Sequence, residues 1–339
     1  MVEPIDVNRP ALLEDRTFLS GSRDETKPTV VVSRCLGFCK CRYNGDVISV
    51  PFVRELLPYV NVVTVCPEVD IGLGIPRNPV RLLLQDGKVE LYQSSEEKTY
   101  TEVMREYTEG FLATVGAVHG FILKGRSPSC GIKDVKIYKG KDKGAASEKG
   151  IGIFATYAID YAGDHPVEEE GRLTNYAIRE HFLTRLFTFF RFEKCVESGR
   201  MRDLIAFHAT HKYLLLAYNQ SQYRTLGSIV ANHEKKPFAE VVSLYREHLG
   251  KALSRLPAKS NFINTFQHIF GYFSDQISPR EKAFLLDRFE KFREDRVHGS
   301  VVINLLHTYV IQYNKEYLLD QVIWMPYPEA LLDIHDSGK

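Results

Sequence analysis

The chain has 339 residues and a mass of 38.8 kDa, which is enough for two domains of ordinary size. Hydrophobic residues make up 44% and charged residues 26% of it, without low-complexity tracts, so neither a disordered chain, a collagen nor a coiled coil describes the whole. The longest apolar runs, around 111–123 and 301–311, are shorter than the roughly 20 residues of a membrane span. The first residues include acids and lack the apolar segment of a signal peptide. These features predict a cytoplasmic protein without a membrane segment.

Charge is nearly balanced, at a net +1, but it is unevenly spread. Residues 172–339 carry five more basic than acidic residues, and residues 1–171 carry four more acidic than basic ones. Nine of the eleven histidines also lie in the second part. The two parts therefore differ in composition, which supports a domain boundary between them. The asymmetry is too small to predict a nucleic-acid surface by itself.

Short apolar segments alternate with helical patterns after a polar, irregular stretch, residues 1–27, which we predict to be a flexible arm. A hairpin is predicted around Asp86-Gly87, because this pair suits a tight turn with positive φ. Helices are predicted at 51–60 and 101–118, and the Lys/Gly-rich residues 139–150 are predicted to be a solvated loop. Strands alternating with helices predict an α/β domain with a mostly parallel sheet over residues 28–165. The predicted buried strands are 29–33, 61–66, 120–125 and 134–138.

The pattern changes after about residue 165, where one amphipathic helix, with acids in its first turns, is predicted to run to about residue 192. Ser278, Pro279 and Glu281 give one later helix a clear start, with a capping serine and a capping box. No strand is predicted in this part, so residues 166–332 are expected to form an all-α domain. The further predicted helices are 201–218, 221–232, 238–253, 260–277, 279–297 and 299–313.

Three cysteines stand just past the carboxyl ends of three predicted strands: Cys35, Cys66 and Cys130. If the strands are parallel, the three thiols meet at one edge of the sheet, where open α/β folds bind ligands. Thiolates are soft ligands suited to iron–sulfur clusters or zinc, and the wide spacing of the three along the chain excludes a local zinc knuckle. Three thiolates leave one iron of a four-iron cluster open to a substrate. The alternative is that all three are inert core residues.

The other cysteines allow a different arrangement. Cys39 or Cys41 could supply a fourth thiolate, which would close the open iron. A structural zinc site is a further alternative, weakened by the large sequence separations. Cys195 falls in a predicted helix and is expected to be a core residue.

The segments SRCLGFCKCRYNG, CPEVDIGLGIPRNP and LKGRSPSCG together resemble the motifs of domain of unknown function 523, whose characterised members are thiouracil desulfidases. The resemblance covers about residues 28–160. It implies a [4Fe-4S] cluster held by Cys35, Cys66 and Cys130, whose fourth iron takes the sulfur of a thiolated pyrimidine. FHATHKYLLLAYNQSQYRTLGSIVA and NTFQHIFGYF resemble domain of unknown function 1722, so the chain looks like a fusion of the two families.

Three stretches depart from the desulfidase pattern, and they leave the identity of the substrate open. Stand-alone desulfidases tend to carry Leu-Leu-Gly after the first cysteine, then Arg-Tyr-Asp-Gly, and later Gly-Gly-Leu-Pro-Thr-Pro-Arg. This chain has Leu36-Gly37, Asn44 in place of the Asp, and Ile71-Gly72-Leu73-Gly74-Ile75-Pro76-Arg77.

Candidate catalytic groups lie beside the cysteines. Glu68 is the candidate general base that activates water at a thiocarbonyl; alternatively it is a loop carboxylate paired with Arg77. Ser127 and Ser129 are candidates to hydrogen-bond a pyrimidine carbonyl or a cluster sulfide, and the alternative is that they cap a turn. Weaker candidates of the same kind are Ser33, Arg42 and Lys124.

The helical part offers His208, His211 and Lys212 as residues that could share a ligand, although ordinary helix positions are the commoner role. Its aromatics could stack bases or simply pack in a core, and they leave RNA open as a partner: Tyr213, Tyr218 and Tyr223. The leading hypothesis is iron–sulfur-dependent, non-redox removal of sulfur from a small-molecule thiolated pyrimidine base or nucleoside. The alternative is a cluster-based redox or iron sensor with a helical partner- or RNA-binding module. The sequence leaves the oligomeric state open.

Overall fold

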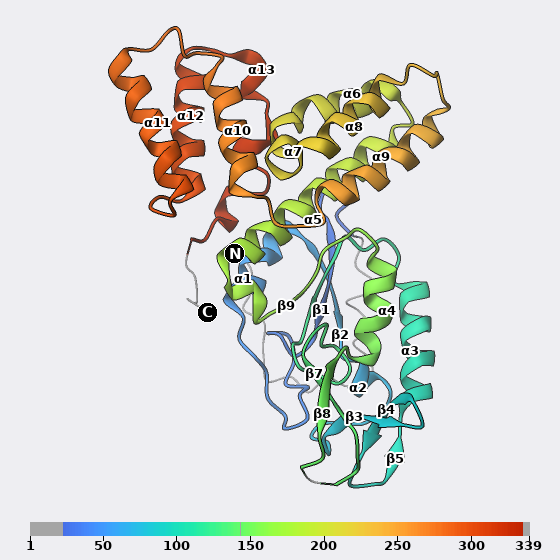
Figure 1. Cartoon of the computed structure of the whole chain (residues 1–339). Coiled ribbons are helices and arrows are strands. Elements are labelled where there is room, and N and C mark those ends of the chain that lie inside the picture. The colour runs from blue at the N-terminus through green and yellow to red at the C-terminus, as the bar shows by residue number, and fades with distance from the viewer. Residues whose placement is uncertain (1–22, 143, 335–339) are drawn as a thin grey trace. The chain divides into compact units, whose positions relative to one another are not determined.

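The computed structural model describes residues 23–142 and 144–334, and these divide into two compact units (Figure 1). The first contains the described residues up to Phe182 together with 330–334, and the second is Leu183–Glu329. Most of the predicted arm, residues 1–22, lies outside the described residues.

The first unit is built on a parallel sheet whose strand order is β2-β1-β6-β9. Strand β1 pairs with both β2 and β6, and all five of its residues are buried. Burial on both faces explains why TVVVS reads as an unbroken apolar run rather than an alternating one. The α/β prediction with a parallel sheet is confirmed. The bounds of the four strands are β1 Thr29–Ser33, β2 Asn61–Val65, β6 Gly120–Leu123 and β9 Val167–Glu169.

Helices connect these parallel strands. Helix α1 (Pro51–Leu56), continued by the 3₁₀ turn η2 (Leu57–Tyr59), leads from β1 to β2, and the short helix α2 (Pro67–Asp70) follows β2 directly. Helix α3 (Thr101–Thr114) precedes β6, and α4 (Ile153–Ala162) precedes β9. From β1 the chain continues to β2, its neighbour on one side, and from β6 it continues to β9, on the opposite side of the sheet. The topological switch point therefore lies between the carboxyl ends of β1 and β6.

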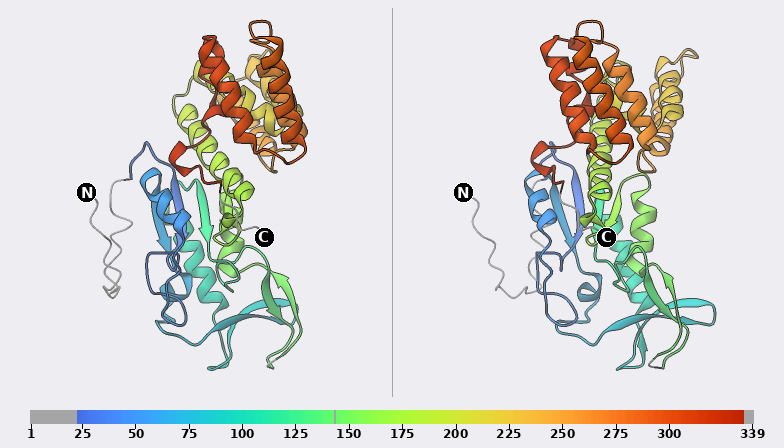
Figure 2. Two further views of the ribbon diagram at one scale, coloured as in Figure 1. Left: turned by 90° about the vertical axis from the view of Figure 1, so that its left-hand side faces the viewer. Right: turned by 60° about the vertical axis from the view of Figure 1, so that its left-hand side comes forward.

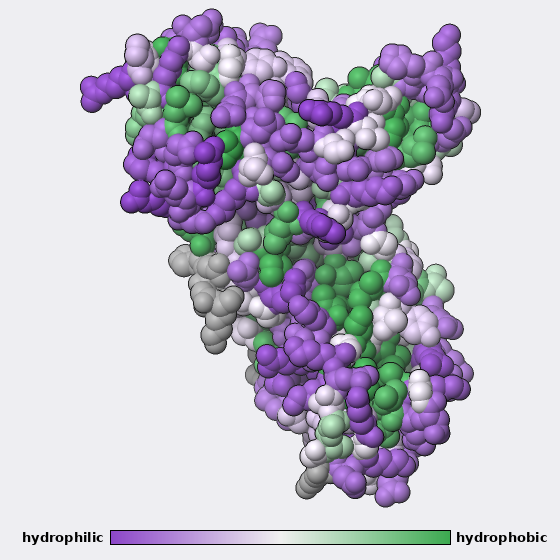
Figure 3. Space-filling model, in the orientation of Figure 1, coloured by the Kyte–Doolittle hydropathy of each residue, from purple (hydrophilic) through white to green (hydrophobic). Residues whose placement is uncertain are grey.

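Helices α3 and α4 lie side by side (Figures 1 and 2), with the rings of Phe111 and Phe154 5.8 Å apart. Phe154, Ala155 and Ala158 of α4 are fully buried in the core of the unit. Apolar residues also reach the surface over α4 (Figure 3). Ile151, which precedes this helix in the chain, is 41% exposed. Across the described residues, no helix combines the length and apolar character that a membrane crossing requires.

A second sheet of the same unit has the order β5-β4-β3-β7-β8. Strands β3 and β4 form the predicted hairpin, with positive φ at Asp86 (51°) and Gly87 (75°). The prediction of a loop throughout 139–150 was wrong at its end, because residues 147–150 form β8 by antiparallel pairing with β7. The bounds are β3 Val80–Gln85, β4 Lys88–Gln93, β5 Lys98–Thr99, β7 Val135–Tyr138 and β8 Ser147–Gly150.

The single helix predicted from residue 165 was also wrong. Val167–Glu169 is strand β9, and a short 3₁₀ turn η3 (Arg172–Thr174) follows before helix α5 begins at Tyr176. The acids of this stretch suggested a helix N-terminus, but parallel pairing of Val167 with Phe121 on the buried strand β6 decides their conformation.

The second unit is helical, as predicted, and has one aromatic-rich core. Ser278 and Glu281 form the predicted capping box at the start of α11. The predicted helix 201–218 is broken at His211 into α6 and α7. The helices after η3 are α5 Tyr176–Glu197, whose first residues up to Phe182 belong to the first unit, α6 Met201–Thr210, α7 Lys212–Tyr218, α8 Gln220–Ala231, α9 Phe238–Ala252, α10 Lys259–Phe270, α11 Pro279–Arg293, α12 Gly299–Gln312 and α13 Glu316–Leu319, with 3₁₀ turns η4 Val322–Trp324 and η5 Glu329–Leu331.

Candidate functional site

Three buried cysteines stand past the carboxyl ends of neighbouring parallel strands. Cys35 follows β1, Cys66 follows β2, and Cys130 lies in the loop after β6. Their exposed fractions are 8%, 8% and 5%. Parallel pairing of β1 with its two neighbours puts all three at the same sheet edge, beside the topological switch point.

Cys41 joins this group. Its side chain is 1% exposed, and its backbone carbonyl accepts from the Cys66 thiol at 3.8 Å. The thiols of Cys35 and Cys66 raise the pKa of Cys41, whereas the Cys41 thiol lowers the pKa of Cys66 and favours its thiolate. Cys39 is half-buried, and burial raises its pKa.

Cys130 is held differently. Burial raises the pKa of its thiol, and the nearby Ser33 hydroxyl at the end of β1 acts in the opposite direction. The Ser33 Oγ in turn accepts from the backbone N–H of Lys124 at 2.9 Å. Ser33 therefore ties the end of β1 to the loop after β6 instead of standing free for a ligand.

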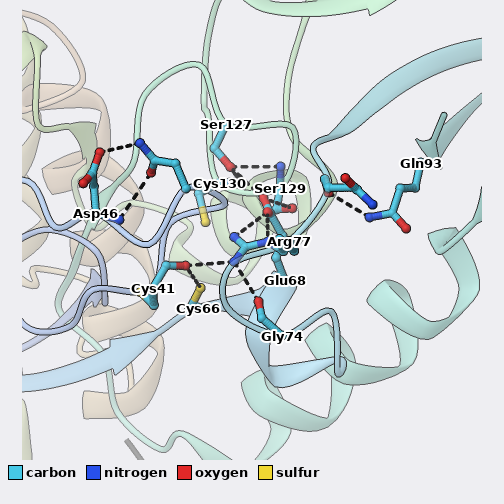
Figure 4. A network of polar contacts seen from close by, with 12 residues as sticks. Cys41, Asp46, Cys66, Glu68, Gly74, Arg77, Gln93, Ser127, Ser129 and Cys130 are labelled. Atoms are coloured by element: carbon cyan, nitrogen blue, oxygen red, sulfur yellow. Dashed lines mark hydrogen bonds and ion pairs between the residues drawn. The ribbon is translucent and has the colours of Figure 1, made fainter. Parts of the chain in front are cut away.

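Glu68, on α2, is the centre of a polar network beside the cysteines (Figure 4). Its Oε2 accepts from Arg77 Nη2 at 2.7 Å and Nε at 2.9 Å. Its Oε1 accepts from Ser129 Oγ at 3.0 Å and from Ser127 Oγ at 3.4 Å. The side chains of Arg77 and Glu68 are only 5% and 12% exposed, so this ion pair is largely withdrawn from water. Arg77 Nη1 also donates to the Cys41 carbonyl at 2.9 Å, which links the carboxylate to the cysteine loop.

The loop that carries Ser127, Ser129 and Cys130 is shaped by its own hydroxyl. Ser127 Oγ accepts from the N–H of Ser129 at 3.2 Å and from that of Cys130 at 3.1 Å, so this serine caps the turn and also faces Glu68. The turn-capping role considered from the sequence is therefore present in Ser127, and its role toward a ligand stays a prediction. The tight turn leaves no room beyond glycine at Gly131, where a Cβ atom would lie 2.5 Å from Val135 Cγ2 and 3.0 Å from the Arg126 nitrogen.

The N-terminus of α4 holds the same loop from behind. Its N–H groups at Ile153 and Ala155 donate to the carbonyls of Pro128 at 3.1 Å and Ser129 at 3.0 Å. The first N–H groups of a helix have no partner within the helix, and the loop supplies two. The serine-cysteine loop is thus built onto a rigid element.

The residues present fit an iron–sulfur cluster by the chemistry of their donors. All six cysteines are free thiols, and the four at the sheet edge provide the soft sulfur ligands that iron–sulfur clusters take. Within residues 23–142 and 144–334, no set of three or more His, Cys, Asp or Glu side chains is arranged to hold a metal ion.

Comparison with known proteins bears on this region. The sequence model of the 2-thiouracil desulfurase family matches residues 30–170. Uncharacterized protein YbbK of Bacillus subtilis (strain 168) is 33% identical over 109 residues, which are 30% of this chain and 72% of that protein. This chain belongs to the 2-thiouracil desulfurase family.

The second part matches another family, described as protein of unknown function (DUF1722), over residues 212–328. The chain therefore joins a 2-thiouracil desulfurase region to a DUF1722 region, as the resemblance predicted. Uncharacterized protein YbgA of Escherichia coli (strain K12) is 25% identical over 158 residues, 46% of this chain and 93% of that protein. A solved structure titled [4Fe-4S]-dependent thiouracil desulfidase TudS is 28% identical, with a TM-score of 0.34, and the match covers 43% of this chain and 93% of that one.

In the 2-thiouracil desulfurase region, two candidate cations have protein partners. Lys124 Nζ pairs with Glu170 at 2.5 Å and donates to the Gly125 carbonyl at 2.8 Å. Arg42 lies 3.9 Å from Asp46 and over the ring of Tyr43. Neither residue contacts Glu68 or a cysteine side chain through a hydrogen bond within the described part of the chain.

The candidates of the DUF1722 region are mainly core residues. His208 Nδ1 lies 3.0 Å from the Tyr245 hydroxyl, and burial lowers its pKa to about 4. His211 is 2% exposed and burial lowers its pKa to about 3. Tyr213 and Tyr218 are buried, so these contacts give no support to base stacking by those two rings. The remaining candidates also have partners inside the unit: Lys212 lies over the rings of Tyr213 and Tyr317, Tyr223 stacks on His208, and Cys195 packs against the helical core.

Two acidic residues that support the site were not identified from the sequence. Asp70 accepts from the backbone N–H of Cys66 at 3.2 Å, pairs with Arg34 at 2.9 Å and accepts from the Tyr107 hydroxyl at 2.6 Å. Glu169 Oε1 accepts from two N–H groups of the loop after Cys130, at 2.8 and 3.1 Å. Asp70 lies one helical turn after Cys66 and could have been suspected from that spacing, whereas no local signal marks Glu169.

Proposed function

We propose that the chain is an iron–sulfur-dependent desulfidase that removes sulfur from a thiolated pyrimidine base or nucleoside without net redox change. Two findings support the proposal: membership of the 2-thiouracil desulfurase family, and four thiols at one sheet edge next to a buried carboxylate–hydroxyl network. The observation that carries it is Glu68, whose carboxylate is held between Arg77 and Ser129 beside Cys66.

Cys35, Cys66 and Cys130 would hold the cluster. A cluster iron left without a protein ligand would supply a Lewis acid able to polarise a carbon–sulfur double bond. The lowered pKa of Cys66 favours the thiolate form that metal binding requires. Asp70 keeps the backbone of Cys66 in place through its N–H.

Glu68 would take the proton from the attacking water. A general base must be positioned before its basicity matters, and Arg77 fixes the carboxylate by two bonds to one oxygen. The other oxygen faces the two serine hydroxyls. Each hydroxyl can rotate its hydrogen toward a pyrimidine carbonyl or keep it on Glu68, so Ser127 and Ser129 would orient the substrate and the base together.

The proposal is tested by purifying the full chain without oxygen, quantifying iron and sulfide, and measuring sulfide release from thiouracil and thiouridine. Cluster-dependent release of sulfide, with the oxygen analogue as the other product, is the expected result. A fully loaded protein that releases no sulfide from any thiolated pyrimidine contradicts it.

A sensor is the second candidate, and the position of Cys41 favours it. Cys41 is 1% exposed and its carbonyl accepts from the thiol of Cys66, so it lies beside a proposed ligand and could complete the ligation of a cluster. Cys41→Ser distinguishes the two functions. A sensor with four thiolates should lose cluster stability and its redox response, whereas an enzyme with three should keep its iron and its sulfide release.

A further inference from the structure

Helix α2 has only four residues, and a helix of one turn is not stable by itself. Its last residue, Asp70, bonds the backbone of Cys66 twice. The Asp70 N–H donates to the Cys66 carbonyl at 2.9 Å, and Asp70 Oδ2 accepts from the Cys66 N–H at 3.2 Å. The position of Cys66 therefore depends on what holds the carboxylate of Asp70.

Arg34 binds both oxygens of this carboxylate. Its Nη1 donates to Asp70 Oδ1 at 2.9 Å and its Nη2 donates to Oδ2 at 3.1 Å, a two-bond geometry that fixes direction as well as distance. The side chains of Arg34 and Asp70 are 25% and 18% exposed, so the pair is partly withdrawn from water. Arg34 directly precedes Cys35, and its carbonyl accepts from the Cys39 N–H at 3.0 Å. One ion pair therefore joins the loop of Cys35 to the backbone of Cys66.

Tyr107 of α3 supplies a further donor to the same carboxylate. Its hydroxyl lies 2.6 Å from Asp70 Oδ2. Burial, together with the charge of Asp70, raises the pKa of Tyr107, so the hydroxyl keeps its proton and acts as the donor. The half-buried ring stacks on Phe111 of the same helix, with the centroids 6.1 Å apart. Arg34, Asp70 and Tyr107 form the Asp70 network, and the proposed reaction does not use its hydroxyl or its guanidinium.

The third proposed ligand is held by other contacts. The Cys130 loop is bound through the Ser127 hydroxyl, the start of α4 and the Glu169 carboxylate. None of these contacts, within residues 23–142 and 144–334, uses a residue of the Asp70 network. The proposed ligands therefore divide into a linked pair, Cys35 and Cys66, and a separately held Cys130.

We propose that Arg34 and Tyr107, acting through Asp70, are positioning residues that hold Cys35 and Cys66 as a preformed pair for the iron–sulfur cluster. The bonds of the network join protein groups alone, so the pair is in place before iron arrives. Residues behind metal ligands commonly change metal affinity by roughly 10–100-fold. The proposal rests on the proposed function for the presence of the cluster, and not for the reaction.

Residue-resolved alkylation of the cluster-free full chain by iodoacetamide tests the pair. The three thiols are at most 8% exposed, so each reacts when its loop opens locally. Tyr107→Phe keeps the stacked ring and removes the hydroxyl. Alkylation of Cys35 and Cys66 should accelerate by roughly 10–100-fold, the weight of one hydrogen bond to a charged acceptor, and that of Cys130 should stay unchanged. Tyr157→Phe is the matched control and should change none of the rates, because this half-buried hydroxyl on α4 has no hydrogen bond to the described residues.

Arg34→Lys is the second variant. A lysine keeps the positive charge but cannot bond both carboxylate oxygens in the same way, so the same two thiols should react faster. Equal acceleration of all three thiols in both variants indicates a general loss of stability and overturns the proposal. Unchanged alkylation of Cys66 in both variants also overturns it.

The full chain reconstituted with iron and sulfide gives a second readout. Tyr107→Phe should lose iron to a chelator roughly 10–100-fold faster than the wild type. The reduction potential of its cluster should shift to a more negative value, because the Asp70 charge has one donor fewer and acts more strongly on Cys66. Wild-type iron loss and potential in this variant overturn the proposal.

The same preparation separates this proposal from the proposed function. A wild-type chain that retains no cluster overturns both. A loaded wild-type chain that releases no sulfide, but shows the expected effects of Tyr107→Phe, overturns the proposed function and supports the positioning role.

Discussion

Replacing Glu68 by Gln removes one negative charge from a buried network and leaves its size unchanged. The carboxylate accepts from four donors, two on Arg77 and one on each of Ser127 and Ser129. The amide can keep its oxygen toward Arg77 and turn its NH₂ toward the serine oxygens. The geometry of the network can therefore survive, but the guanidinium loses its counter-charge.

The cost follows from burial. Arg77 is 5% exposed and Glu68 12%, and removing one partner of a buried pair costs about 3–5 kcal/mol. Because the amide oxygen still accepts from Arg77, we expect a loss at the lower end, about 3 kcal/mol, in the free energy of unfolding of the first unit. Sulfide release should fall by roughly 10²–10⁴-fold, the usual contribution of a general base, while the iron content stays at the wild-type level.

The assay must report on the right unit. The one tryptophan, Trp324, lies in the second unit, so hydrogen exchange of segments 66–79 and 124–131, followed by mass spectrometry, measures the first unit directly. Glu102→Gln, at a 75% exposed helical position, is the matched control and should change stability by less than about 0.5 kcal/mol. The double variant Glu68→Gln/Arg77→Met should recover part of the stability, because no unpaired charge remains, but none of the activity.

Three results would refute this reasoning. Full activity with an intact cluster removes Glu68 from the mechanism. Loss of the cluster from Glu68→Gln makes the residue structural. Unchanged hydrogen exchange in both segments shows that the ion pair does not hold the two loops together.

Further predictions concern the cysteines, pH and one glycine. Replacing Cys35, Cys66 or Cys130 by Ser should remove most of the iron and the broad absorbance near 400 nm, because a hydroxyl is a poor substitute for a thiolate. The control Cys195→Ser should keep both, and full iron in all three single variants would contradict the ligand set. Burial lowers the pKa of His211 from 6.5 to about 3, so its contribution to stability is complete above pH 6.5 and is lost in acid, because the unfolded chain binds the proton before the folded one. At pH 4 the loss due to His211 should be roughly 3 kcal/mol, in addition to that of His208, so in unfolding followed by Trp324 fluorescence the acid-induced loss should shrink by about this amount in His211→Gln and stay unchanged in His233→Gln. Gly131→Ala forces the Cys130 loop to move, so it should lower the free energy of unfolding by about 1–3 kcal/mol and reduce the iron content. Gly110→Ala, with open space around its Cβ position in α3, should be neutral or stabilising in chemical unfolding monitored by hydrogen exchange, and equal behaviour of the two variants would contradict the tight turn.

The sequence predicts the parts of the fold that carry strong local patterns. Strands β1 and β6 are buried along their whole length and read as apolar runs, and the Asp86-Gly87 turn marks its hairpin. Strand β2, at the edge of its sheet, is buried at Val63 and Val65 and half-buried at its other residues. Strand β8, with the sequence SEKG, has no apolar pattern, and it exists only because β7 offers an unpaired edge. Strand β9 also lacks an apolar pattern, because two of its three residues are acids, and it forms by pairing with β6, a strand far earlier in the chain.

The site shows the same limit. Motif spacing could place Cys35, Cys66, Cys130 and Glu68 near one sheet edge, because strand topology brings loop starts together. It could not tell that Ser129 and Arg77 would contact the two oxygens of the same carboxylate, since those contacts depend on how two loops that are distant in the sequence pack together.

The contacts that hold the Cys130 loop determine when, during synthesis of the chain, this loop can take its final conformation. The carbonyls of Pro128 and Ser129 are bound by the start of α4, and the N–H groups of Ile132 and Lys133 are bound by Glu169. Both supports come later in the chain than the thiol they position, and Glu169 comes after the whole of α4. A chain emerging during synthesis therefore carries its cysteines well before it can hold them in register, and one that ends short of Glu169 has the three thiols but not the frame that keeps the third in place.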